Sequence, residues 1–327
     1  MPFLLIVIIA LAMVFDFLNG FHDSSNIVAT MISSRAMSPR VAMGITAVAE
    51  FSGPFLFGVA VATTIGSEVV DPAMISSAVI IAALSSAVVW NVVTWYFGWP
   101  SSTSHALVGG LIGAVGVAEG LSTIRLAGME KILIALFFSP MLGLVLGYLV
   151  LKVIYFLARG ASPGVNQVFK RSQLLTSLAL ALSHGTNDAQ KTMGVIAMAM
   201  VTTGYTAEFH VPWWVILLSA SAIALGTAVG GWRLIRTLGG KFYKIRPVHA
   251  FASQLTSASI ILGAALLGGP VSTTQVVSSA IMGAGAADRV SKVRWTVARD
   301  VAVAWVLTIP VSALLAAGLY LLVDLIV

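Results

Sequence analysis

The chain has 327 residues, of which 58% are hydrophobic and only 9% are charged, with a formal net charge of +6. A soluble globular protein usually carries about 25% charged residues, so this composition excludes a soluble fold and predicts an all-α polytopic membrane protein. The absence of cysteine excludes disulfide bonds and thiolate chemistry.

The first apolar segment lies at the N-terminus, where a cleaved signal peptide is the alternative interpretation. Residues 2–15 contain no basic residue, and no small-residue cleavage site precedes the polar stretch 16–26. We therefore expect this segment to remain as the first membrane helix.

Six apolar stretches are long enough to cross about 30 Å of hydrocarbon as helices of about 20 residues. They cover residues 2–32, 42–66, 127–158, 172–203, 212–232 and 300–326. Two further stretches, 73–118 and 247–285, are interrupted by Gly98-Trp99-Pro100 and by Gly268-Gly269-Pro270. Each of these is expected to form a helix, a turn and a shorter helix.

Basic residues gather in four loops, around residues 35–40, 152–171, 233–246 and 289–299. The positive-inside rule places these loops in the cytoplasm, so the positive charge indicates orientation in the lipid bilayer and not binding of nucleic acid. The chain then divides into residues 1–158, a cytoplasmic connecting loop at 159–171, and residues 172–327, which repeat the first series with every direction reversed. The sequence thus predicts a multi-pass protein of the cell (inner or plasma) membrane with two inverted-topology repeats. Each repeat is expected to contain a broken helix and a re-entrant helical hairpin.

Two motifs support this duplication. GFHDSSNIVA (20–29) aligns with GTNDAQKTMG (185–194), which places Asp23 opposite Asp188 at a separation of 165 residues. GWPSSTSHALVGGLIGA (98–114) aligns with GGPVSTTQVVSSAIMGA (268–284), which places Thr103 opposite Thr273 at a separation of 170 residues. Inverted repeats with interrupted helices are typical of secondary transporters, whose substrate sites lie near the membrane midplane.

Asp23 and Asp188 lie near the middle of their apolar segments, where an ionisable group costs about 2.5–3.5 kcal/mol. Asn26 and Lys191 follow three residues later on the same helical face. The two carboxylates are candidates for cation coordination or proton carriage. The alternative is a buried pair, such as Asp188 with Lys191, that only joins helices. Because the motif occurs twice, we favour the functional interpretation.

Other polar residues of the motifs are weaker candidates for the same site. Gly20 and Gly185 are expected to break their helices and to free backbone carbonyls for a cation. His22 and Asn187 occupy matched positions and are candidates for cation binding or proton coupling. His184, which matches Asn19, is likewise harder to interpret as a packing or surface residue than the other histidines. Glu50 lies about one third of the way into a predicted span, where it is either a site contact or a packing hydrogen bond.

The two hairpin tips place proline near a helix start, followed by hydroxyl side chains. These side chains are Ser101, Ser102, Thr103 and Ser104 in the first tip and Ser272, Thr273 and Thr274 in the second. Free N–H groups and the positive end of the helix dipole collect at such a start, which therefore binds oxyanions. The alternative is ordinary capping of a helix by Ser or Thr. The duplication favours an anion site between the two tips.

GFHDSSNIVAT and HGTNDAQKTMG, with the two Pro-Ser/Thr tips, resemble the paired signature motifs of the inorganic phosphate transporter (PiT) family, in the form of its low-affinity bacterial permeases. The resemblance extends from about Asp16 to Arg299. It implies symport of inorganic phosphate with a cation, a homodimer, no enzymatic activity and no cofactor beyond the co-transported H+ or Na+. By motif position it assigns the substrate and ion site to Asp23, Asn26, Ser101, Ser102, Thr103, Asp188, Lys191, Ser272, Thr273 and Thr274.

The motifs depart from the sodium-coupled members of that family at two positions. Those members typically carry Asn in place of His22 and a small or amide residue in place of Lys191. A lysine ammonium beside Asp188 could occupy the space of a sodium ion or could attract phosphate directly. We therefore predict proton coupling, with Asp23, Asp188 or His22 as the carrier, and keep sodium at the two aspartates as the alternative.

Other functions remain open on the residues alone. The same fold could carry sulfate or a neutral metal–phosphate complex, although protonated phosphate can donate a hydrogen bond to an aspartate whereas sulfate offers only acceptors. An intramembrane hydrolase could use the two aspartates as acid and base, but the duplicated hydroxyl tips would then have no role. A channel is disfavoured because paired charged motifs indicate a site that holds its ligand.

Overall fold

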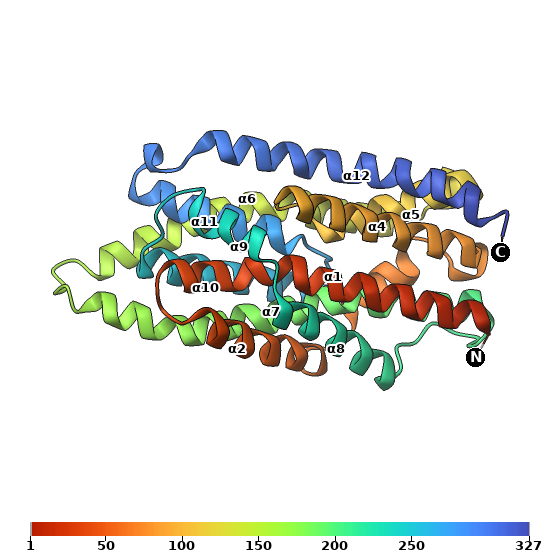
Figure 1. The fold of residues 1–327 in the computed structure, drawn as a ribbon, viewed down its shortest axis with the longest axis horizontal. Helices are drawn as coiled ribbons and strands as arrows, with labels where there is room; N and C mark the ends of the chain where they lie inside the picture. The colour runs from red at the N-terminus through yellow and green to blue at the C-terminus, as the bar shows by residue number, and fades with distance from the viewer. Residues whose placement is uncertain (1, 327) are drawn as a thin grey trace.

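Long runs of aliphatic residues with few charges form a bundle of helices in the computed structural model, which describes residues 2–326 (Figure 1). The first half of the chain contains α1 (Phe3–Ser33), α2 (Pro39–Ser52), α3 (Ala60–Thr63), α4 (Ser77–Phe97), α5 (Thr103–Ala118) and α6 (Leu126–Leu157). The second half contains α7 (Val165–Thr202), α8 (Trp213–Val229), α9 (Trp232–Gly240), α10 (Pro247–Leu266), α11 (Thr273–Asp288) and α12 (Trp295–Val323). Short 3-10 or π turns cover Gly53–Phe55, Thr64–Glu68, Pro72–Met74, Leu121–Thr123 and Val290–Lys292. Within the described residues there is no strand, and the predicted all-α fold is confirmed.

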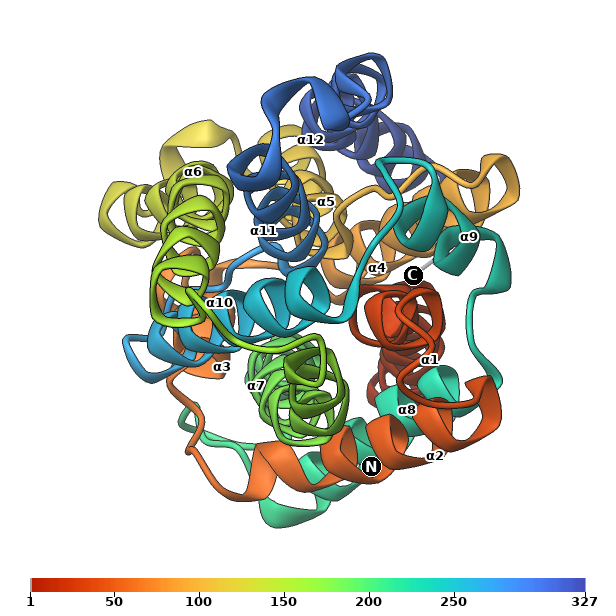
Figure 2. The same cartoon turned by 90° about the vertical axis from the view of Figure 1, so that its left-hand side faces the viewer.

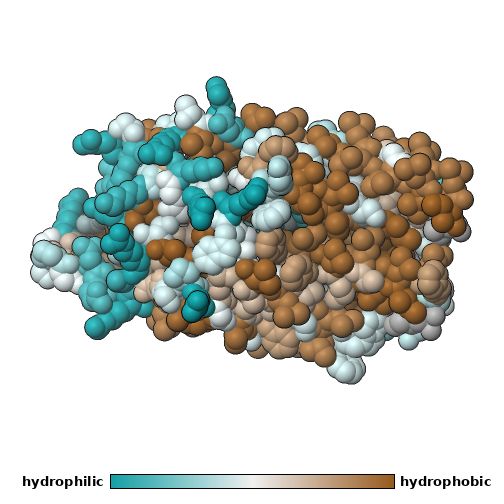
Figure 3. Space-filling model, in the orientation of Figure 1, coloured by the Kyte–Doolittle hydropathy of each residue, from teal (hydrophilic) through white to brown (hydrophobic). Residues whose placement is uncertain are grey.

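The surface is that of a membrane protein. Five helices are long and apolar enough to cross a bilayer, and up to seven spans result when each of two bent helix pairs is counted as one. Hydrophobic side chains cover most of the visible face, whereas hydrophilic ones gather at the end opposite the two termini (Figure 3). The chain is therefore a multi-pass membrane protein, and its hydrophilic end is the one that the positive-inside rule assigns to the cytoplasm.

Both predicted hairpins are present, as α4–α5 and α10–α11. Gly98 and Gly268 end the first helix of each hairpin in the left-handed conformation, with φ of 68° and 72°, which glycine adopts at little cost. Ser102 and Ser272 then cap the second helix by accepting a hydrogen bond from the backbone N–H three residues later. The matched tips therefore have matched local geometry.

The expected breaks at Gly20 and Gly185 are wrong, because α1 and α7 pass through these glycines without interruption. The glycines instead allow close helix crossings. A Cβ atom at Gly20 would lie 2.0 Å from the carbonyl oxygen of Ile223 on α8, and one at Gly185 would lie 2.3 Å from that of Glu50 on α2. No backbone carbonyl is therefore freed for a cation at either motif.

Each half does contain a broken helix, but elsewhere. The segment Pro39–Phe55 meets Ala60–Met74 at 69°, and Trp213–Val229 meets Trp232–Gly240 at 70°. The connection between the halves is also shorter than expected, because α7 begins at Val165 and so includes residues 165–171.

The two halves are interlocked. α5 packs against α12 and α11 packs against α6, so each hairpin lies on the last helix of the other half. In the same way α1 packs against α8 and α7 against α2 (Figure 2). Residues 1–158 and 172–327 are thus not separate bodies, and the inverted relation between them stays a prediction.

Candidate functional site

Asp23 lies on the buried side of α1, where four side chains lie within 3.4 Å of its carboxylate. One oxygen, Oδ1, accepts a hydrogen bond from the Thr274 hydroxyl at 2.8 Å and lies 3.0 Å from His22 Nδ1. The other, Oδ2, lies 3.1 Å from the Thr273 hydroxyl and 3.4 Å from the Thr103 hydroxyl. Thr103 begins α5 and Thr273 begins α11, so both hairpin tips meet at one carboxylate of α1.

Asp188 on α7 has a different environment, dominated by one cation. Lys191 Nζ lies 2.5 Å from Asp188 Oδ1, 2.6 Å from the Ser104 hydroxyl and 3.1 Å from the Val271 carbonyl oxygen. The side chain of Lys191 is 1% exposed, so its charge is removed from water and is balanced by these three acceptors. Lys191 thereby connects α7 to both hairpin tips.

Thr273 connects the two aspartates. Its hydroxyl lies 3.1 Å from Oδ2 of Asp23 and 3.1 Å from Oδ2 of Asp188. A hydroxyl has one proton, which it donates to one carboxylate or shares between both. Thr273 thus holds the two carboxylates at one hydroxyl oxygen.

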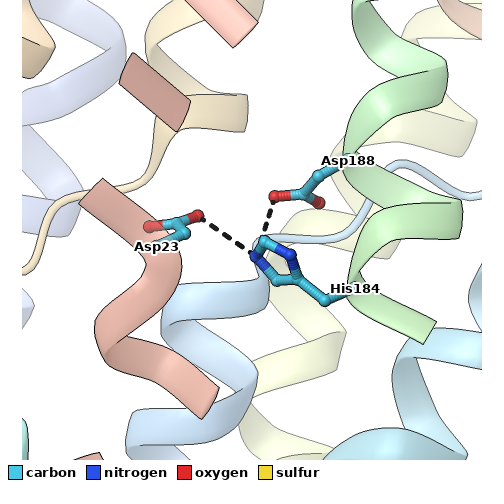
Figure 4. A group of neighbouring side chains, drawn as sticks. All are labelled: Asp23, His184 and Asp188. Carbon is cyan, nitrogen blue, oxygen red and sulfur yellow. Dashed lines mark ion pairs between the residues drawn. The ribbon is translucent and has the colours of Figure 1, made fainter. Parts of the chain in front are cut away.

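His184 also lies between the two carboxylates (Figure 4). Its Nε2 is 3.4 Å from Asp188 Oδ2 and 3.8 Å from Asp23 Oδ2, while its Nδ1 is 2.8 Å from Glu50 Oε1. Glu50, His184 and the aspartates therefore form a continuous buried chain of ionisable groups. The sequence had singled out Glu50 as a candidate, and His184 by its match to Asn19, but it had not assigned His184 to the site, although a histidine one turn before Asp188 on the same helix face was a usable signal.

The amides of the two motifs hold the hairpins. Asn26 Nδ2 donates to the Thr274 hydroxyl at 3.1 Å, so Asn26 acts on the first carboxylate through Thr274. Asn187 Nδ2 donates to the carbonyl oxygen of Gly269 at 3.1 Å, which places Asn187 at the turn of the second hairpin. The structure therefore brings Asn26 to the aspartates and turns the amide nitrogen of Asn187 towards the hairpin.

The serines of the tips divide into three groups. Ser102 and Ser272 accept the backbone N–H of the third residue beyond them, as capping residues do. Ser104 donates to the carbonyl oxygen of Val271 at 3.0 Å and so joins the two tips. Ser101 donates to Thr94 at 2.8 Å, and Thr94 lies 3.4 Å from His22 Nε2, so Ser101 reaches Asp23 only through other side chains. Of the hydroxyls predicted for the site, only those of Thr103, Thr273 and Thr274 contact a carboxylate directly.

The chain is similar to known transporters over its whole length. The model of the phosphate transporter family matches residues 19–163 and 158–316. A probable low-affinity inorganic phosphate transporter of Bacillus subtilis (strain 168) is 43% identical, covering 99% of this chain and 98% of the relative. A protein of the same description from Rhizobium meliloti (strain 1021) is 44% identical, covering 99% of this chain and 97% of the relative. A solved structure titled the sodium-dependent phosphate transporter has a TM-score of 0.90 at 25% identity, covering 99% of this chain and 100% of the other.

Proposed function

The chain belongs to the phosphate transporter family, and from this premise we propose that it is a secondary active transporter that imports inorganic phosphate by symport with a cation. The observation that carries the proposal is the meeting of two capped helix starts, with their hydroxyls, at two buried carboxylates. Helix starts and hydroxyls supply donors for an oxyanion, and the carboxylates supply acceptors for the hydrogens of protonated phosphate.

Charge balance supports symport. Asp23, Asp188 and Glu50 bring three carboxylates into a buried region in which Lys191 places an ammonium group against Asp188. Phosphate adds further negative charge, and buried charge of one sign is costly unless it is compensated. We therefore expect phosphate to enter together with a cation that compensates its negative charge.

The donors around the aspartates favour protons over sodium as that cation. Each of the four carboxylate oxygens already lies within 3.4 Å of a hydroxyl, an imidazole or an ammonium group. Hard metal ions take about six or more oxygen ligands, whereas imidazole nitrogen suits transition metals. A proton needs a single oxygen, and we propose Asp23, Asp188, His22 and the Glu50–His184 pair as its carriers.

The interlocked halves support transport by alternating access. The hydroxyls and carboxylates of the site are at most 4% exposed, so the site is closed to both sides. We propose that phosphate and the cation bind near the midplane and that one set of packed helices moves against the other to open the site. We also propose that two copies form a homodimer, which mass measurement by light scattering would test.

Reconstituted proteoliposomes test the function directly. We expect saturable phosphate uptake that is driven by an inward proton gradient and is unaffected by excess sulfate. The sodium gradient, the proton gradient and divalent metal are varied one at a time. A strict sodium requirement at constant pH would overturn proton coupling, a strict metal requirement would indicate a metal–phosphate substrate, and the absence of saturable uptake would overturn the proposed function.

A further inference from the structure

Asp16 is a second buried acid on α1 that the site described above does not use. It is 0% exposed, and neither of its carboxylate oxygens has a hydrogen-bond partner among the described residues. Asn19, on the same face of α1, is also 0% exposed, and both polar atoms of its side chain lack a partner. Asp16 precedes Asp23 by two helical turns, about 10 Å along the axis.

Thr192 approaches this group from α7, one turn beyond Asp188. Asn19 follows Asp16 by three residues on the same face of α1, and Thr192 belongs to α7, which packs against α1. The hydroxyl of Thr192 nevertheless makes no hydrogen bond of ordinary geometry and is buried. Three buried polar side chains between α1 and α7 thus lack the partners that buried polar groups normally have.

An ionised Asp16 would be untenable in these surroundings. An unpaired carboxylate costs several kcal/mol when it is removed from water, and more so at membrane depth. On α7, the charged residues Asp188 and Lys191 lie within one turn of Thr192 and are of opposite sign. α4 and α8, which also pack on α1, contain no charged residue. α9 contacts α1 at Ala29, α10 at Thr30, and α11 at Asp23 and Asn26, all seven or more residues beyond Asp16.

α2 packs on α1 as well, and its buried acid, Glu50, belongs to the site already described. Glu50 lies 2.8 Å from His184 and, as an acid, offers no positive charge to Asp16. A hard metal ion would need about six or more oxygen ligands, more than Asp16, Asn19 and Thr192 supply. A proton on the carboxyl group removes the charge and provides a donor for Asn19 or Thr192.

We propose that Asp16 binds a proton of its own, taken from the outer side of the membrane, and that this proton crosses together with phosphate. The N-terminal part of α1 lies at the end opposite the hydrophilic loops (Figures 1 and 3), so Asp16 lies between the outer surface and Asp23. The residue matched to Asp16 in the second motif is Ala181, at a separation of 165 residues, so this proton site belongs to one half alone. The inference rests on the proposed proton-coupled symport and adds one proton to it.

Infrared spectroscopy tests the protonation directly, whether or not transport is measured. A protonated carboxylic acid has a carbonyl band that a carboxylate lacks. We expect the difference between the wild-type protein and Asp16→Asn at neutral pH to contain this band, and we expect Thr192→Val to shift it. Spectra that do not differ in this band would overturn the inference, even if phosphate transport is established.

Accumulation of phosphate tests the coupling. With an inward pH gradient of one unit, each coupled proton contributes about tenfold to the accumulation ratio. Asp16→Asn is therefore expected to accumulate about tenfold less phosphate than the wild type, while Asp16→Glu recovers part of the difference. Asp324→Asn, which neutralises an exposed carboxylate near the C-terminus, is the matched control and should behave as the wild type.

The outcomes separate the two proposals. Wild-type protein without proton-driven uptake would overturn the proposed coupling, and the infrared band would then decide on Asp16 alone. Proton-driven uptake in the wild type with the same accumulation ratio in Asp16→Asn would overturn the inference and leave the proposed function intact. A reduction that sodium restores would also overturn it, because the carried cation would then be sodium.

Discussion

The two aspartates of the site occupy matched positions but have different partners. The third residue after each one reaches a hydroxyl on a hairpin tip, Asn26 to Thr274 at 3.1 Å and Lys191 to Ser104 at 2.6 Å. In the α1 half the Thr274 hydroxyl donates to Asp23, whereas in the α7 half the Lys191 ammonium itself contacts Asp188. The duplicated motif thus gives both halves the same geometry, and only the α7 half places an ammonium group beside its aspartate.

A second difference concerns the residue one turn earlier on each helix. His184 of α7 matches Asn19 of α1. α2 crosses α7 with Glu50 beside the motif, whereas α8 crosses α1 with Ile223 at the matched place. Only His184 has a carboxylate to pair with, at 2.8 Å. The α7 half therefore carries ionisable pairs, whereas Asp23 is held mainly by neutral hydroxyls.

The largest effect is expected from Asp188→Asn, because it leaves the buried ammonium of Lys191 without its carboxylate. Removing one partner of a buried pair costs about 3–5 kcal/mol, so both stability and phosphate uptake should be lost. Thermal unfolding and proteoliposome uptake measure the two. The control is Asp188→Asn combined with Lys191→Met, which should regain stability but not uptake. Wild-type stability of the single variant would contradict the pairing.

Asp23→Asn should separate uptake from stability. The hydroxyls of Thr103, Thr273 and Thr274 can rotate to accept from an amide, so we expect a normally folded protein. Hydrogen bonds to a charged group contribute about 1.5–3 kcal/mol each, so losing the carboxylate should reduce uptake roughly 100-fold. Uptake within a factor of two of the wild type would show that Asp23 does not act at the site.

The sequence alone predicted the hairpins and the aspartates because each depends on local composition and was present twice. The prediction at the motif glycines was wrong for a physical reason. A glycine can mark either a helix break or a close crossing of two helices, and only the positions of α2 and α8 show that these two glycines allow crossings. His184 was singled out but not assigned to the site, because its partner Glu50 is distant in the sequence. The capping roles of Ser102 and Ser272 were anticipated as the alternative, but the hydrogen bond from Ser101 to Thr94 was not.

Lys191→Asn would give the α7 half the residue of the α1 half. Asp188 would then need another positive charge, and an amide oxygen beside a carboxylate is a ligand that suits hard ions. We expect the variant to take up roughly tenfold less phosphate without sodium, equal to about 1.4 kcal/mol, and to recover in part when sodium is added. The thermal unfolding temperature in NaCl should exceed that in KCl for the variant but not for the wild type. Equal behaviour in the two salts would indicate that Lys191 does not replace an ion.

The smallest effect is expected at Ser101, where the two tips differ because the matched residue is Val271. Ser101 donates to Thr94 and not to an aspartate, so Ser101→Ala should cost about 1 kcal/mol of stability and change uptake less than twofold. Thr103→Val keeps the shape of a side chain that lies 3.4 Å from Asp23, and its loss of a hydrogen bond to a charged group should reduce uptake about tenfold. A larger loss in Ser101→Ala than in Thr103→Val would reverse this assignment and return Ser101 to the phosphate site that the motif resemblance implies. The expected order instead means that phosphate is held by the positions whose hydroxyl occurs in both halves.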